Sequence, residues 1–135
     1  MNNTVNNPEF VNAIAVGTGY ETEVKVTPQD TAASYGSGDL EVYATPAMIA
    51  LMEKTAMASL KKLLPEGYTT VGTRVDIKHI KATPLHEKVH CKATITEVQY
   101  PKLTFAVEAS DSKGPIGTGT HRRYIVEKTS FLANL

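Results

Sequence analysis

The sequence of 135 residues has a single cysteine, no tryptophan and no excess of either charge. Its 14 basic residues balance its 14 acidic residues, so the chain as a whole does not attract nucleic acid or an anionic membrane. No apolar run approaches the roughly 20 residues that a membrane-spanning helix requires. The N-terminus lacks the charged start and apolar stretch of a signal peptide. Because Cys91 has no second cysteine to pair with, we expect a cytoplasmic protein.

The sequence also lacks a cluster of metal ligands. Its four histidines are scattered along the chain, and Cys91 has no cysteine partner at the spacing of a zinc site. We therefore expect no bound metal. The length suits one domain, residues 1–135, and the hydrophobic share of 41% is ordinary for a globular protein with one core.

One long segment, residues 43–64, has helical periodicity. Thr45 and Pro46 favour a helix start, because a Thr hydroxyl can accept from the free N–H groups of the first turn and proline suits the first helical position. Pro65 and Gly67 then end the helix. Apolar residues cover more than one narrow stripe, so most of the helix should be buried. These residues are Met48, Ile49, Leu51, Met52, Ala56, Leu60, Leu63 and Leu64.

After this helix the pattern changes to an alternation of apolar and polar residues, which is typical of strands. Strands are predicted at residues 20–26, 68–82, 87–99, 103–109 and 115–126. The third and fourth of these each have one predicted apolar face, formed by Val89, Cys91, Ala93 and Ile95 and by Leu103, Phe105, Val107 and Ala109. The connections between the last four are too short for parallel crossovers, so the sheet should be antiparallel. One helix packed on one antiparallel sheet is an α+β domain. The outer edge of the sheet has no partner within the chain, and we expect dimerisation to cover it.

Residues 27–40, between the first strand and the helix, are rich in Pro, Asp, Ser and Gly and are predicted to form a loop. A loop of about 14 residues is long for a compact domain and is often a lid or a binding loop. Because it leads directly into the helix, we expect it to gate a pocket at the helix start.

Two side chains do not suit a plain apolar core. Glu53 lies four residues after Ile49 on the helix, and an ionised carboxylate among apolar neighbours costs free energy unless it is paired. His79 lies at the end of the predicted inner face of the second strand. The other members of that face are Val71, Thr73, Val75 and Ile77. A structural role is open for each, with Glu53 reaching solvent and His79 bonded to a backbone carbonyl in the core.

A chemical role is open as well. Thr45 lies at the predicted N-terminus of the helix, where free N–H groups can hold a developing oxyanion. A hydroxyl, a carboxylate and an imidazole could thus meet at one end of the helix and support attack on an acyl group. The other three histidines, His86, His90 and His121, are weaker candidates. His86 lies in a turn, and His90 lies on the outer face of its strand.

Three stretches, ATPAMIALME, VGTRVDIKHIKATP and GTGTHRRYIVEK, resemble the fluoroacetyl-CoA thioesterase-like group of hotdog-fold thioesterases. The likeness covers roughly residues 42–128. The signature of that group is a Thr just before the helix, a Glu eight residues later and a His that ends the following strand. This chain has the same spacing, because 53 − 45 = 8 and 79 − 53 = 26. The resemblance implies that Thr45, Glu53 and His79 are catalytic and that Gly72 and Arg123 bind the acyl group.

The resemblance also implies a hotdog fold, in which the sheet wraps around one central helix, and a homodimer with its active site at the subunit interface. The implied activity is hydrolysis of the CoA thioester of a small acyl group, with CoA as part of the substrate and no separate cofactor. His79 would act as a general base towards water or Thr45. Glu53 would orient the imidazole or attack the acyl carbon itself, and the sequence does not separate these roles.

Two other activities remain open at this point. A hotdog dehydratase or isomerase would use a histidine and a carboxylate without needing Thr45, and a non-catalytic acyl-CoA binding protein would keep only the pocket. The fluoroacetyl-specific enzyme carries phenylalanines in the loop before the helix. Here Tyr35 is the only nearby aromatic residue before Tyr43, so we expect a different acyl selectivity.

Overall fold

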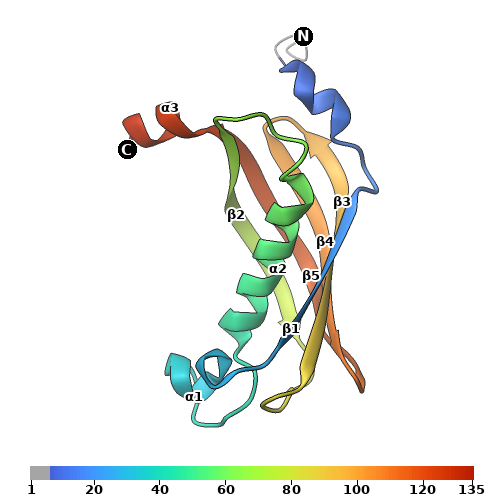
Figure 1. Ribbon diagram of the computed structural model, residues 1–135, viewed down its shortest axis with the longest axis vertical. Helices are drawn as coiled ribbons and strands as arrows, with labels where there is room; N and C mark the ends of the chain where they lie inside the picture. The colour runs from blue at the N-terminus through green and yellow to red at the C-terminus, as the bar shows by residue number, and fades with distance from the viewer. Residues whose placement is uncertain (1–6) are drawn as a thin grey trace.

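The computed structural model describes residues 7–135, so residues 1–6 of the predicted domain lie outside it. A five-stranded sheet curves around one long helix, α2 (Thr45–Leu60) (Figure 1). The strand order is β1-β3-β4-β5-β2, and every pairing is antiparallel. The strands are β1 (Gly19–Lys25), β2 (Tyr68–His79), β3 (Lys88–Gln99), β4 (Lys102–Asp111) and β5 (Gly114–Glu127). The predicted α+β architecture is confirmed.

The core lies between the buried face of α2 and the concave face of the sheet (Figure 1). On α2, Met48, Met52 and Leu60 are almost fully buried. On β3 and β4 the alternating residues that the sequence placed inside are all buried: Val89, Cys91, Ala93, Ile95, Leu103, Phe105, Val107 and Ala109. Burying each large apolar side chain contributes roughly 1.5–3 kcal/mol, so this interface accounts for most of the attachment of the helix to the sheet.

The start of α2 differs in detail from the prediction. The N-cap residue is Ala44, which offers no side-chain cap, and Thr45 is the first residue of the helix. The predicted capping role of Thr45 is therefore wrong, because its hydroxyl is turned to a partner on β2. The helix also ends at Leu60, before the predicted 64, because the amides of Lys61 and Leu63 bond carbonyls only three residues back.

Residues 27–40 are more ordered than the predicted loop. They contain the 3-10 helix η3 (Pro28–Asp30) and the short helix α1 (Ala32–Tyr35). Asp30 and Thr27 form a capping box around η3, and Thr31 Oγ1 accepts from the Ser34 amide at the start of α1. These local hydrogen bonds satisfy backbone groups of this segment that are not paired in the sheet. Figure 1 shows α1 beside the N-terminal end of α2.

The inner face of β2 is the main error of the sequence-based interpretation. The register against β5 shifts between Gly72 and Arg74, which places a bulge at Thr73. An extra residue in a strand moves the side chains beyond it to the other face. Before the bulge the inward side chain is that of Thr70, which is buried, and after it Ile77 and His79 point inward. Val71 and Thr73 therefore do not share a face with His79, and the strand ends there and not at residue 82.

The remaining elements lie at the two ends of the chain. The 3-10 helix η2 (Glu9–Ala13) precedes β1, and α3 (Lys128–Ala133) follows β5 (Figure 1). None of the helices that the structure describes in residues 7–135 is long and apolar enough to cross a membrane.

Candidate active site

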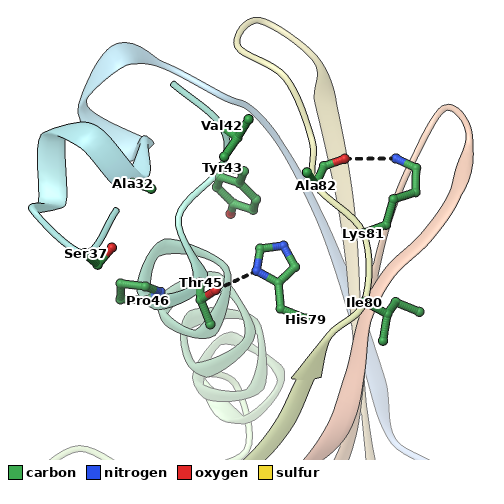
Figure 2. A pocket seen from close by; sticks show the side chains of 10 residues that line it. All are labelled: Ala32, Ser37, Val42, Tyr43, Thr45, Pro46, His79, Ile80, Lys81 and Ala82. Atoms are coloured by element: carbon green, nitrogen blue, oxygen red, sulfur yellow. Dashed lines mark hydrogen bonds between the residues drawn. The ribbon is translucent and has the colours of Figure 1, made fainter. Parts of the chain in front are cut away.

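Thr45 and His79 meet where the first turn of α2 approaches the end of β2. The Oγ1 atom of Thr45 lies 2.7 Å from Nδ1 of His79. Figure 2 marks this hydrogen bond with a dashed line. The helix and the strand bring these residues together although they are 34 positions apart in sequence. The hydroxyl is thus hydrogen-bonded to an imidazole at a helix N-terminus, where free N–H groups favour negative charge.

The surroundings of His79 favour the neutral imidazole. Burial lowers the pKa of His79 below its ordinary value, and the nearby Lys81 backbone acts in the opposite direction. A neutral ring can accept the Thr45 proton at Nδ1, which is the first requirement of a general base. The other ring nitrogen, Nε2, is buried and makes no hydrogen bond of good geometry within residues 7–135.

A cavity of about 430 Å³ lies over this pair. One wall is formed by Ala32 on α1 and by Ser37 just after α1, and another by the segment that follows His79 (Figure 2). The remaining lining residues are Val42, Tyr43, Pro46, Ile80, Lys81 and Ala82. Segment 27–40 therefore contributes directly to the cavity, and its predicted gating role remains a prediction.

The wall that follows His79 is held by a buried carboxylate. Asp111 has a side chain only 1% exposed, and its Oδ2 accepts from Lys81 Nζ at 2.6 Å and from Thr83 Oγ1 at 2.9 Å. Burial tends to raise the pKa of Asp111, but hydrogen bonds led by the one from Lys81 hold it below its ordinary value. The carboxylate stays ionised and ties the end of β2 to the β4–β5 turn.

Glu53 lies apart from Thr45 and His79 within one chain. It follows Thr45 by eight residues, which is about 12 Å of helix at 1.5 Å per residue. Its Oε2 lies 3.8 Å from Nη1 of Arg123, and its side chain is 41% exposed. A single chain thus brings together the hydroxyl and the imidazole of the predicted set, and pairs the carboxylate with Arg123.

Gly72 and Arg123, the predicted acyl-binding residues, lie beside Glu53. A Cβ atom on Gly72 would stand 2.6 Å from Glu53 Oε2 and 3.3 Å from Arg123 Nη1, so glycine is what lets these charges approach the strand. Arg123 is buried, and it donates from Nε to Thr70 Oγ1 at 2.8 Å and from Nη2 to the Thr70 carbonyl at 3.0 Å. The guanidinium is therefore fixed in orientation, and Glu53 provides its counter-charge.

The sequence-based interpretation gave His121 too little weight. This residue is 1% exposed and contacts both Arg123 and the β2 backbone. The available signal was alternation along β5, which places His121 on the same face as Arg123 and Ile125. His90, by contrast, is on the surface as predicted, with Nε2 2.7 Å from Glu21 Oε1. His86 lies in a turn with a positive φ of 73°.

Comparison with known proteins assigns the family. Residues 26–129 match the family FlK, fluoroacetyl-CoA-specific thioesterase. The chain belongs to the fluoroacetyl-CoA-specific thioesterase family. A relative of this FlK family, the fluoroacetyl-CoA thioesterase of Streptantibioticus cattleyicolor, is 33% identical over 95 residues, which span 70% of this chain and 68% of the relative.

Solved structures agree with this FlK assignment. A mutant of FlK is 29% identical, with a TM-score of 0.84 over 89% of this chain and 93% of that protein. A hot-dog-like protein from Thermanaerovibrio acidaminovorans is 28% identical, with a TM-score of 0.84 over 94% of this chain and 93% of its own. The predicted hotdog fold is confirmed, and this FlK family member is a thioester hydrolase.

Proposed function

We propose that this protein hydrolyses the CoA thioester of a small acyl group at the cavity above Thr45 and His79. The observation that carries the proposal is the 2.7 Å contact between Thr45 Oγ1 and the neutral imidazole of His79. One solved structure of an FlK mutant, 28% identical with a TM-score of 0.82, is a complex with fluoroacetate and CoA. The related fold supports a similar placement of acyl group and CoA here.

The contact supports two routes for the attack. In the first, His79 Nδ1 takes the Thr45 proton, Oγ1 attacks the thioester carbonyl, the C–S bond breaks and the CoA thiolate leaves with the proton from His79. A water molecule, activated in the same way, then hydrolyses the Thr45 ester. In the second route a water at Nδ1 attacks the thioester directly. Mass spectrometry of rapidly quenched enzyme separates them, since only the first forms acylated Thr45.

We also propose that the working unit is a homodimer joined along β2. Within residues 7–135 this strand pairs only with β5, so its other side is a free sheet edge in that part of the chain. Val75, near the middle of β2, is 45% exposed, and so is Met57 on α2. Two copies of β2 can therefore pair antiparallel about an axis near Val75 and cover these apolar side chains.

Such a dimer accounts for the position of Glu53. With the two-fold axis near Val75, the end of β2 that carries His79 lies beside the Gly72 end of the partner strand, where the partner subunit's Glu53 also lies. The carboxylate would thus act across the interface on the imidazole or on the acyl carbon. In this proposal CoA enters as part of the substrate, no separate cofactor takes part, and the compartment is the cytoplasm.

A panel of acyl-CoA substrates tests the activity. With a thiol reagent present, wild-type protein should release free CoA from small acyl-CoAs. Because positioned proton transfer is worth 10²–10⁴-fold, His79→Ala and Glu53→Gln should each lose roughly that factor, and Thr45→Ala should also lose activity. A change in the acyl group without free CoA would indicate a dehydratase or isomerase. A thermal shift without reaction would indicate a binding protein. Near wild-type turnover by folded His79→Ala protein would overturn the site.

A further inference from the structure

The imidazole of His121 forms two hydrogen bonds that define its protonation state. Its Nδ1 lies 2.8 Å from the carbonyl oxygen of Arg74, and its Nε2 lies 3.2 Å from Nη1 of Arg123. A carbonyl can only accept, so Nδ1 carries the proton. A guanidinium can only donate, so Nε2 is bare. The buried ring is therefore neutral, with its single proton on Nδ1.

These two bonds reach the acyl site, the name we give to the predicted acyl-binding residues Gly72 and Arg123 together with Glu53. Arg74 is the residue at which the β2 register resumes after the bulge, and Gly72, just before the bulge, faces Glu53. Arg123 has its Nε and Nη2 hydrogens directed to Thr70, and His121 takes a hydrogen of Nη1. The same Nη1 atom lies 3.8 Å from Glu53 Oε2. His121 thus contacts both the β2 backbone next to the bulge and the charged end of Arg123.

We propose that His121 is a positioning residue of the acyl site, which holds the β2 bulge with Nδ1–H and the Arg123 guanidinium with Nε2. This proposal rests on the proposed thioesterase function. His121 does not touch the reacting atoms. It acts by keeping Arg123 and the Gly72 backbone in the arrangement that receives Glu53.

The charges around the ring keep it neutral. The groups that face it are Arg123 on its own strand, Glu53 from α2, the Arg74 carbonyl from β2 and the uncharged ring of Phe105 from β4. Burial is the main cause that lowers the pKa of His121, and Arg123 lowers it further. The Arg74 carbonyl and Glu53 act in the opposite direction. Protonation at Nε2 would direct an N–H at the guanidinium and break the contact.

Nitrogen NMR of histidine-labelled wild-type protein tests the contacts without any substrate. We expect the His121 ring to show a protonated Nδ1 and a bare Nε2 at neutral pH, with the Arg123→Lys variant used to identify the perturbed ring. A proton on Nε2, or an imidazolium at neutral pH, would overturn the proposal. This readout does not depend on hydrolysis, so it separates a failure of the His121 contacts from a failure of the thioesterase function.

Paired amide substitutions test the positioning role. The amide of Gln can reach the position of Nε2 and accept from Arg123, whereas the amide of Asn can reach the position of Nδ1 and donate to Arg74. His121→Asn should therefore lower kcat by roughly 10- to 100-fold, the value of one hydrogen bond to a charged group, with KM little changed. His121→Gln should retain more of kcat than His121→Asn at comparable Tm.

The same substitutions at His90 provide the matched control. His90 is exposed and pairs only with Glu21 in the described chain, so His90→Asn and His90→Gln should leave kcat and KM unchanged. Wild-type kcat in folded His121→Asn protein, or losses that merely follow the Tm of each variant, would overturn the positioning role. Absence of CoA release by wild-type protein would overturn the proposed function instead.

Discussion

The imidazole of His79 should make hydrolysis depend on pH. Burial lowers the pKa of His79 from an ordinary value of about 6.5, and a general base works only when neutral. We therefore expect kcat/KM to rise with pH, with an inflection below the ordinary histidine pKa of about 6.5. Initial rates measured across the acidic range check this. The profile of His90→Gln should match the wild type, and an inflection above the ordinary histidine pKa would contradict the assignment.

The same pKa has a consequence for stability. Unfolded His79 binds its proton near pH 6.5, whereas the folded residue binds it only at lower pH. The unfolded state therefore takes up more protons as the pH falls below about 6.5, and the free energy of unfolding decreases over that window. Urea denaturation at several pH values measures the free energy of unfolding of wild type and His79→Ala. Its decrease at acidic pH should be smaller in the variant.

Adding one methyl group at Gly72 should lower activity and leave stability nearly unchanged. A Cβ there would stand 2.6 Å from Glu53 Oε2, the far end of a flexible side chain that can move aside. We expect Gly72→Ala to fold with a Tm near that of the wild type and to lose at least about tenfold in kcat, because Glu53 and Arg123 are displaced. Gly19→Ala is the control, since a Cβ there would meet its nearest atom at 3.4 Å. Equal activity of the two variants would contradict this role.

At the scale of the element, α1 and the residues after it should determine which acyl groups fit. Ser37 lines the cavity above Thr45 and His79 and is itself exposed, so a larger side chain can be placed there without disturbing the core. We expect Ser37→Phe to shift the ranking of acyl-CoA substrates towards shorter acyl groups, because it reduces the cavity volume. The ratio of kcat/KM for short and long acyl-CoAs measures this.

Ser34 offers a matched control for that experiment. It is exposed on α1, three residues before Ser37, but does not line the cavity, so Ser34→Phe should leave the substrate ranking as in the wild type. An unchanged ranking in Ser37→Phe would mean that segment 27–40 only connects β1 to α2.

At the scale of the whole molecule, the free edge of β2 should decide both assembly and activity. We expect wild-type protein to sediment as a dimer and Val75→Arg to sediment as a monomer. In a dimer of the variant, the two introduced positive charges would be buried against each other at the proposed axis. Hydrolysis should be lost with the dimer, since within one chain Glu53 lies about 12 Å along α2 from Thr45, the partner of His79. Val16→Arg, at a valine that is 64% exposed before β1, should change neither property. An active monomer would rule out a site shared between subunits.

Much of this molecule follows from local patterns. The helix start at Thr45, the four consecutive strands and the inner faces of β3 and β4 were predicted correctly, because periodicity and turn residues act over a few neighbouring positions. The likeness of three short stretches to one family also predicted the fold, and it singled out Gly72 and Arg123, which the structure places together beside Glu53.

Only the tertiary structure decided the bulge at Thr73, the partner of the Thr45 hydroxyl and the place of His121. The bulge depends on how β2 pairs with β5, residues that lie about 50 positions apart and exert no local preference on one another. Thr45 carries a hydroxyl that suits a helix cap, and it bonds His79 because folding brings β2 within reach. In the sequence, His121 and Arg123 only continue the ordinary alternation of inward and outward residues along β5. Their roles arise because their partners Arg74, Thr70 and Glu53 come from other elements of the fold.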